Sequence, residues 1–228
     1  MITQIYSIQT PEEGVMCAEK GADYVGVAVS TGADLPSEVS VEKCKEIFDA
    51  IGDRAKKVVI VVTKTDEPIY DPVAYLKPDV IHLCGYDYMA TPEFCRKVKE
   101  LVPGIEVLQA IGVCDYSSVG QAVEFSEFCD TLILDSVDRK INGIGAAGFT
   151  HDWNIDAEIV RKASCKCILA GGLGPDNVAE AIRKVRPWGV DSFTKTSDRL
   201  PDGGTRKNPE KVEAFIRNAR AAFAELQK

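Results

Sequence analysis

The segment that decides the fold is residues 167–182, which read CILAGGLGPDNVAEAI, followed by residues 187–196, PWGVDSFTKT. An apolar run ends at the double glycine Gly171-Gly172, a Pro-Asp-Asn helix start follows, and an amphipathic helix leads to a second apolar strand. Glycines at such a turn let backbone N–H groups approach an anion, toward which the next helix points its positive end. The segment therefore predicts a phosphate site, although the glycines alone equally suit a tight βα turn.

The same alternation runs through all 228 residues. Strands are predicted at residues 2–8, 22–29, 58–62, 79–83, 106–111, 131–135, 167–170 and around Val190. About eight strand–helix units with short connections predict an α/β protein, a parallel eight-stranded closed (β/α)8 barrel (TIM barrel) that forms one domain over residues 1–228. An open doubly wound sheet stays as the alternative, because periodicity does not show closure.

Composition and charge limit the partners. Hydrophobic residues make up 45% of the chain and charged residues 27%, which is typical of a globular protein. The formal net charge of -8 argues against nucleic acid and against an anionic membrane surface as partners. No apolar run approaches the roughly 20 residues of a membrane span, and the first residues lack the layout of a signal peptide. We expect a cytoplasmic monomer or homodimer that binds a small molecule.

The cysteines do not form a metal-binding pattern. Eight are present, no two of them have CxxC spacing, and the chain has only two histidines. A zinc site needs ligands that converge, which this spacing does not offer. We therefore predict no metal site and interpret most of the cysteines as reduced, buried hydrophobic residues.

A barrel of this class carries its chemistry where the strands end, at the C-terminal face. The acid–base candidates at the predicted strand ends are Asp135, Tyr6 and His82. The candidates for phosphate binding are Gly145 in the glycine-rich loop 142–148, Gly171 and Gly172 after the seventh strand, and Thr194, Lys195 and Thr196 after the eighth. Lys195 would supply positive charge.

Each acid–base candidate also has a structural interpretation. Asp135 would otherwise cap a loop, and Tyr6 would line the mouth as an aromatic wall, since a phenol with an ordinary pKa near 10 needs a cationic neighbour to act as a base. His82 titrates near neutrality but falls inside an apolar run, where a hydrogen-bonded core histidine is equally expected. Cys84 and Cys114 are weaker candidates, because nothing around them marks a lowered pKa.

Several segments resemble the phosphoribosylanthranilate isomerase family of tryptophan biosynthesis, and the likeness covers nearly the whole chain. The similar segments are residues 5–12 (IYSIQTPE), 21–26 (GADYVG), 134–136 (LDS), 143–153 (ending in FTHDW), 169–173 (LAGGL), 187–191 (PWGVD) and 207–212 (KNPEKV). The resemblance implies a TIM barrel that catalyses an Amadori aldose–ketose rearrangement of a sugar phosphate without a cofactor. It also implies that Asp135 is the general acid.

The chain departs from the family pattern at three places. One is the end of the eighth strand, where the family has a Ser-Gly segment whose amides bind phosphate and this chain has Phe193-Thr194-Lys195-Thr196-Ser197. Tyr6 stands where the family has its cysteine base, and Ser37 stands where it has the arginine that holds the anthranilate carboxylate. The resemblance therefore implies an isomerase of a phosphorylated sugar or its amine adduct, with a base that the pattern does not identify and a changed substrate as one outcome.

Two other function classes stay open. Lys195 lies in a Thr-Lys-Thr-Ser segment that is similar to the lysine strand of deoxyribose-phosphate aldolase, which would imply a Schiff-base lyase. The absence of the cysteine and the arginine would also suit a non-catalytic barrel that binds a ligand.

Overall fold

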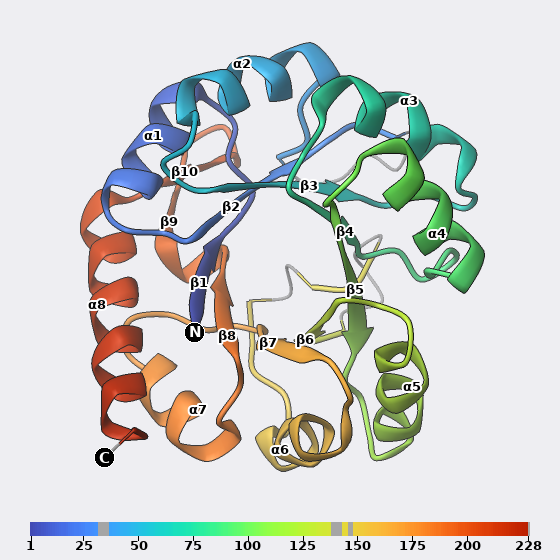
Figure 1. Cartoon of the computed structure of the whole chain (residues 1–228). Coiled ribbons are helices and arrows are strands. Elements are labelled where there is room, and N and C mark those ends of the chain that lie inside the picture. Colours follow the sequence, from blue (N-terminus) through green and yellow to red (C-terminus); the bar gives the residue numbers. More distant parts are fainter. Residues whose placement is uncertain (32–36, 138–142, 146–147, 228) are drawn as a thin grey trace.

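The computed structural model describes residues 1–31, 37–137, 143–145 and 148–227. Eight parallel strands pair in chain order, and β1 closes the ring by pairing with β8 (Figure 1). The strands are β1 (Ile2–Ile5), β2 (Tyr24–Ala28), β3 (Lys56–Val61), β4 (Val80–Leu83), β5 (Glu106–Gly112), β6 (Thr131–Asp135), β7 (Lys166–Leu169) and β8 (Gly189–Ser192). The predicted closed barrel is confirmed, and the open sheet is excluded.

In the described part of the chain, eight α-helices form a ring outside the strands (Figure 1). They are α1 (Pro11–Glu19), α2 (Val41–Ile51), α3 (Glu67–Leu76), α4 (Pro92–Leu101), α5 (Ser117–Ser126), α6 (Trp153–Lys162), α7 (Val178–Val185) and α8 (Pro209–Glu225). The N-caps explain several starts: the hydroxyls of Thr10 and Thr91 accept from backbone N–H groups three residues on, and proline follows each threonine.

The region after β8 is more elaborate than the sequence pattern indicated. A 3₁₀ turn, η1 (Thr194–Thr196), leads into the antiparallel pair β9 (Ser197–Arg199) and β10 (Thr205–Lys207) before α8. These strands have three residues each and carry polar side chains, so no apolar alternation announces them. The first strand is also shorter than predicted: it ends at Ile5, and Ser7 has a φ of 62°.

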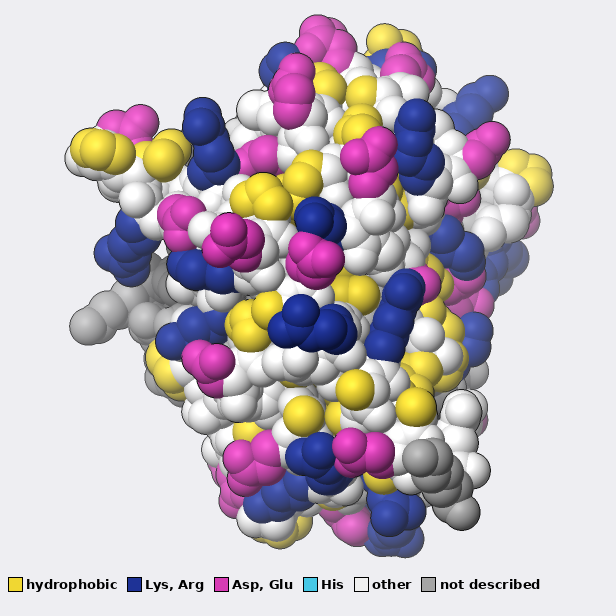
Figure 2. Space-filling view, turned by 90° about the vertical axis from the view of Figure 1, so that its left-hand side faces the viewer, with side chains coloured by type: hydrophobic (Ala, Val, Ile, Leu, Met, Phe, Trp, Pro, Cys, Tyr) yellow, Lys and Arg dark blue, Asp and Glu magenta, His cyan; other side chains and the backbone are white. Residues whose placement is uncertain are grey.

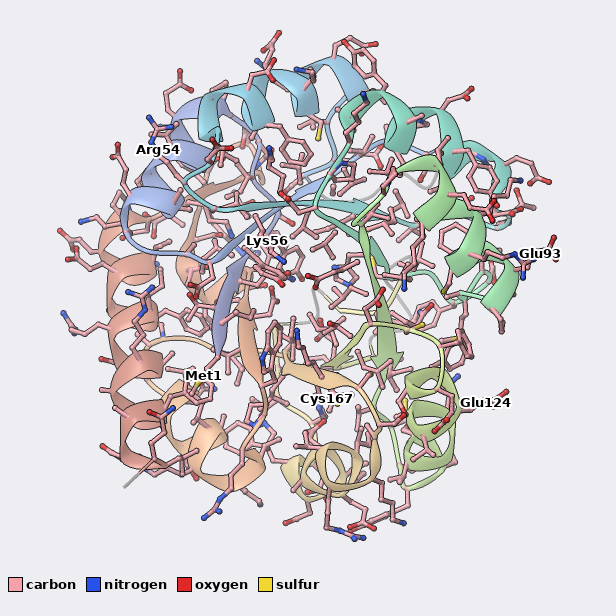
Figure 3. All side chains as sticks on the ribbon, in the orientation of Figure 1. Met1, Arg54, Lys56, Glu93, Glu124 and Cys167 are labelled. Carbon is pink, nitrogen blue, oxygen red and sulfur yellow. The ribbon has the colours of Figure 1, made fainter. Side chains whose placement is uncertain are left out.

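Apolar side chains form two layers. One lies between the strands and the helices, and the second fills the barrel interior with residues such as Val58, Ile60, Ile133 and Ile168. Figure 3 shows side chains occupying the space enclosed by the strands. Because the interior is packed, a ligand has access only at the ends of the barrel.

The outer surface mixes both signs of charge. Figure 2, which shows the side that carries α1 and α8, shows Lys and Arg side chains interspersed with Asp and Glu. Lys20, the C-cap residue of α1, pairs with Glu213 of α8 at 2.6 Å on this side. Within the described part of the chain, no helix combines the length and apolar character that crossing a membrane requires.

The cysteines follow the prediction in most positions. All eight are free, and six of them are buried: Cys17, Cys44, Cys84, Cys95, Cys129 and Cys167. In the described ranges, no group of three or more His, Cys, Asp or Glu side chains is arranged to hold a metal ion.

Candidate functional site

A pocket opens at the C-terminal ends of four strands. It is lined by Tyr6 after β1, Asp135 at the end of β6, Gly171, Gly172 and Leu173 after β7, Asp191 and Ser192 of β8, and Gly148, Phe193 and Thr194 from the loops. This is the face where barrels of this architecture place their chemistry. The opposite face carries the strand starts, including Met1 and Lys56, which Figure 3 labels.

Asp135 is the central carboxyl group of the pocket. Its side chain is 7% exposed, and its Oδ1 atom accepts a hydrogen bond from the backbone N–H of Ser136 at 2.7 Å. Burial raises the pKa of Asp135 to about 7, and the Ser136 N–H opposes that rise. A carboxyl group that keeps its proton up to neutrality can act as a general acid.

The double glycine is required by the loop that packs on it. Gly171 and Gly172 have φ values of 82° and 61°, in the left-handed region. A Cβ on Gly171 would lie 2.5 Å from Ser136 Oγ, and one on Gly172 would lie 2.6 Å from the carbonyl carbon of Phe149. The turn is therefore tight, as one interpretation predicted, and both glycines also line the pocket.

Side-chain hydrogen bonds fix this turn. The Nδ2 atom of Asn177 donates to the Gly172 carbonyl at 3.1 Å, and its Oδ1 atom accepts from the Gly174 N–H at 2.8 Å. The Ser192 hydroxyl donates to the Leu173 carbonyl at 2.7 Å. These bonds hold the loop between β7 and α7 at a fixed distance from β8.

The structure brings only part of the predicted phosphate set to the pocket. Gly171, Gly172 and Thr194 line it. Lys195 is exposed and its Cβ packs over Gly174, whereas Thr196 is fully buried and donates from Oγ1 to the Phe193 carbonyl at 3.0 Å. A 3₁₀ turn has about three residues per turn, so consecutive side chains of η1 point in three different directions.

Gly145 also lies elsewhere than predicted. It packs directly against the Asp135 carboxyl group instead of lining the pocket, and its backbone N–H donates to the Ser136 carbonyl at 3.1 Å. Its placement makes it a support for the carboxyl group of Asp135.

His82 is not at the mouth of the barrel. It is 5% exposed inside β4, and within the described part of the chain neither ring nitrogen has a hydrogen-bond partner. Burial lowers the pKa of His82 to about 3, so the ring is neutral at ordinary pH. The strand continues through Leu83, which leaves His82 below the rim. It is a core histidine, although without the hydrogen bonds that were expected for one.

Tyr6 lies at the mouth as an aromatic wall. Its ring centroid is 5.1 Å from that of Phe193 at an interplanar angle of 51°. On the other side it is close to Gly26, where a Cβ would lie 2.8 Å from Tyr6 Cβ. Ser37, another of the positions of departure, contacts Thr205 of β10 through their hydroxyl oxygens at 3.2 Å.

Two buried ionisable residues, one lining the pocket and one beside it, were not predicted. Asp191 is 2% exposed, and its Oδ1 atom accepts from Gln4 Nε2 at 3.0 Å. Lys207 is 4% exposed, and its Nζ atom donates to the Phe193 carbonyl at 3.2 Å and to Ser197 Oγ at 3.0 Å. The sequence does contain a signal for Asp191, because an aspartate within the mostly apolar segment 189–193 indicates a buried polar group. Nothing in the sequence around Lys207 indicates that it is buried.

A Ser-His-Asp chain lies behind the pocket. Ser136 Oγ is 2.9 Å from His151 Nδ1, and His151 Nε2 is 2.9 Å from Asp156 Oδ1. Ser136 is fully buried and donates its proton to the Phe149 carbonyl at 2.6 Å, so its hydroxyl is not poised as a nucleophile. These hydrogen bonds connect the loop after β6 to the start of α6.

Comparisons with known proteins agree with this geometry. Residues 3–217 match the family described as N-(5'-phosphoribosyl)anthranilate (PRA) isomerase. The N-(5'-phosphoribosyl)anthranilate isomerase of Methanopyrus kandleri is 31% identical over 94% of this chain and 96% of its own length. That of Methanocella arvoryzae is 31% identical over 82% of this chain and 85% of its own.

Solved structures give the same result. The phosphoribosyl anthranilate isomerase of Thermotoga maritima has a TM-score of 0.80 and 28% identity, and the match covers 97% of this chain and 100% of that one. A phosphoribosyl anthranilate isomerase in complex with reduced 1-(o-carboxyphenylamino)-1-deoxyribulose 5-phosphate has a TM-score of 0.77 and 26% identity over the same shares of the two chains. With its barrel, its buried strand-end carboxyl group and its double-glycine turn, this chain belongs to the N-(5'-phosphoribosyl)anthranilate isomerase family.

Proposed function

We propose that this protein catalyses the Amadori rearrangement of a phosphorylated sugar that carries an amine at C1, with N-(5'-phosphoribosyl)anthranilate as the first substrate to test. The observation that carries the proposal is the position of Asp135, a buried carboxyl group in the same pocket as Gly171 and Gly172, and burial raises its pKa to about 7. The names of the relatives support the reaction class.

The reaction needs only proton transfers. An acid protonates the ring oxygen, the bond from that oxygen to C1 breaks, and an iminium forms between C1 and nitrogen. A base then removes the proton from C2, and the resulting enaminol rearranges to the 2-keto sugar. Asp135 supplies the first proton in this proposal, because its raised pKa keeps it protonated close to neutral pH.

The phosphate group is assigned to the turn after β7 and the loop after β8. Gly171 and Gly172 have the left-handed backbone that lets consecutive N–H groups face an anion, and Thr194 adds a hydroxyl at the same rim. Lys195 takes no part in this proposal, since its exposed side chain lies outside the pocket. For the same reason a Schiff-base lyase that uses Lys195 is not favoured.

Recognition of the aromatic acid is the part that differs from the family pattern. Ser37 cannot pair with a carboxylate as an arginine would, and its hydroxyl contacts Thr205. We therefore assign substrate selection to the sugar phosphate and expect weak discrimination by the anthranilate carboxylate.

The test is to incubate the purified protein with N-(5'-phosphoribosyl)anthranilate and to measure by chromatography how much 1-deoxyribulose isomer forms. The adduct of ribose 5-phosphate with aniline serves as the comparison substrate, since it lacks the carboxylate. We expect turnover of both substrates with kcat/KM values within about 10-fold, because Ser37 offers the carboxylate no charged contact.

The matched control is Asp79→Asn, at the opposite end of the barrel, where the Oδ2 atom accepts from the Lys57 N–H at 2.7 Å. It should keep the activity, whereas Asp135→Asn should lose on the order of 100-fold in kcat or more. No turnover of either adduct by the unmodified chain would contradict the proposed reaction.

A further inference from the structure

The pocket that Asp135 lines contains a second carboxyl group, that of Asp191. Leu134 pairs with Leu169, and Leu169 pairs with Val190, so Asp135, Ala170 and Asp191 each stand one residue further along adjacent strands. Asp135 and Asp191 therefore lie at the same level of the barrel, two strands and roughly 10 Å of backbone apart. Both side chains line the pocket between them.

We infer that Asp191 is the general base of this enzyme, in the place of the cysteine that the family carries at position 6. The inference rests on the proposed isomerase function. Asp135 and Asp191 then form a carboxyl pair that shares one proton, with Asp135 as the acid and Asp191 as the base.

Burial and then the charge of Asp135 raise the pKa of Asp191 well above its usual range. Two groups act in the opposite direction and favour its ionised form: Gln4 Nε2 donates to its Oδ1 atom at 3.0 Å, and the buried ammonium group of Lys207 acts on it electrostatically. When Asp135 holds the proton of the pair, its repulsion of Asp191 disappears, so the two carboxyl groups titrate as one unit.

Other groups near Asp191 are less suited to remove a proton. Burial, together with Asp135 and Asp191, raises the pKa of the Cys84 thiol to about 12, which keeps it protonated. Burial lowers the pKa of Lys207 to about 8, but its Nζ atom is held by Phe193 and Ser197. His82 lies below the rim and does not line the pocket.

The proton balance closes over one turnover. Asp135 gives its proton to the ring oxygen as the C1–O bond breaks, and it becomes a carboxylate. Asp191 removes the C2 proton, whose bonding electrons form the C1–C2 double bond and neutralise the iminium nitrogen. Asp191 then protonates C1 as the C2 hydroxyl loses its proton to Asp135. Both carboxyl groups return to their starting states, and the reaction needs no further reactant.

Isotope effects distinguish a base from an acid. With substrate deuterated at C2, Asp191→Asn should lower kcat at least 100-fold and show an enlarged isotope effect, because proton removal becomes the slow step. Asp135→Asn should also lower kcat but show little isotope effect, since ring opening limits its rate. Asp191→Glu should recover part of the activity, and Asp79→Asn is again the control.

A second measurement does not depend on activity. Carbon-13 NMR of the side-chain carboxyl carbons should show one proton shared by the pair at pH 7, and Asp135→Asn should lower the pKa of Asp191. If the unmodified chain turns over no adduct, the proposed reaction fails, and this titration still decides whether the pair exists. Three results would each overturn the inference. They are an isotope effect that is enlarged in Asp135→Asn instead, full activity of Asp191→Asn, and a pKa of Asp191 that does not change in Asp135→Asn.

Discussion

Gly145 lies directly against the carboxyl group of Asp135: a Cβ atom at Gly145 would be 2.4 Å from Asp135 Oδ2. The backbone φ of Gly145 is 102°, which L side chains rarely adopt. Any side chain at this position must therefore move either the loop or the carboxyl group. The acid of the proposed reaction is held on one side by this glycine and on the other by the Ser136 N–H.

Gly145→Ala should consequently lower kcat by at least 10-fold while the chain remains folded, because the added methyl group displaces the Asp135 carboxyl group from its working position. The measurement is steady-state kinetics together with urea unfolding. Gly120→Ala is the matched control, since Gly120 lies inside α5 and a Cβ there meets no atom within 4 Å. That variant should gain about 0.5–1 kcal/mol of stability and keep its kcat. Equal kinetics for the two variants would contradict this role of Gly145.

Asp135→Asn should stabilise the fold at neutral pH although it removes the acid. The pKa of Asp135 is about 7 in the folded chain, above the value of about 3.9 for an unfolded aspartate. The stability that Asp135 contributes is therefore fully present below about pH 4 and is lost as the pH rises through 7. Asparagine does not titrate, so the variant should gain on the order of 4 kcal/mol over the unmodified chain between pH 4 and pH 8. Urea unfolding at pH 5 and pH 8 measures this, and a difference that stays constant with pH would refute the pKa assignment.

His82→Leu should keep the activity and improve resistance to acid. The pKa of His82 is about 3 in the folded chain and about 6.5 in an unfolded one. The neutral buried ring therefore costs no stability above pH 6.5, and the free energy of unfolding falls as the pH drops from 6.5 toward 3. Leucine removes a buried ring whose nitrogens have no hydrogen-bond partner among the described residues, and it adds no charge at low pH. Unfolding curves at pH 4 and pH 7, together with kcat, test this. A 100-fold loss of kcat would restore His82 as a candidate base.

Tyr6→Phe should retain kcat within about 5-fold, because the ring contributes a wall that packs on Phe193 and the proposed base is a carboxylate. Tyr6→Ala should instead raise KM, since the mouth loses an aromatic side chain. A loss of two orders of magnitude in kcat on removal of the hydroxyl alone would assign the base to Tyr6.

The sequence by itself determined the architecture. Runs of β-branched residues such as 58–62 favour strands, and N-cap residues such as Thr10 and Thr91 mark where helices begin. Both signals act within a few residues, so the strands and most helices could be placed without coordinates. Strand ends are equally local, which is why Asp135 and the double glycine were found. The polar hairpin β9–β10 was missed because its strands are short and carry no apolar alternation.

Only the tertiary structure decided which strand-end residues meet. Asp191 lies at the same level as Asp135 and in the same pocket because the pairing of β6, β7 and β8 sets their register, and no local pattern encodes a register between strands. Lys207 is buried because β10 folds back under the Phe193 loop, whereas Lys195, which the sequence favoured, is turned outward by η1. The pKa values of Asp135 and His82 likewise depend on burial by residues distant in the chain, and burial is a property of the packed barrel as a whole.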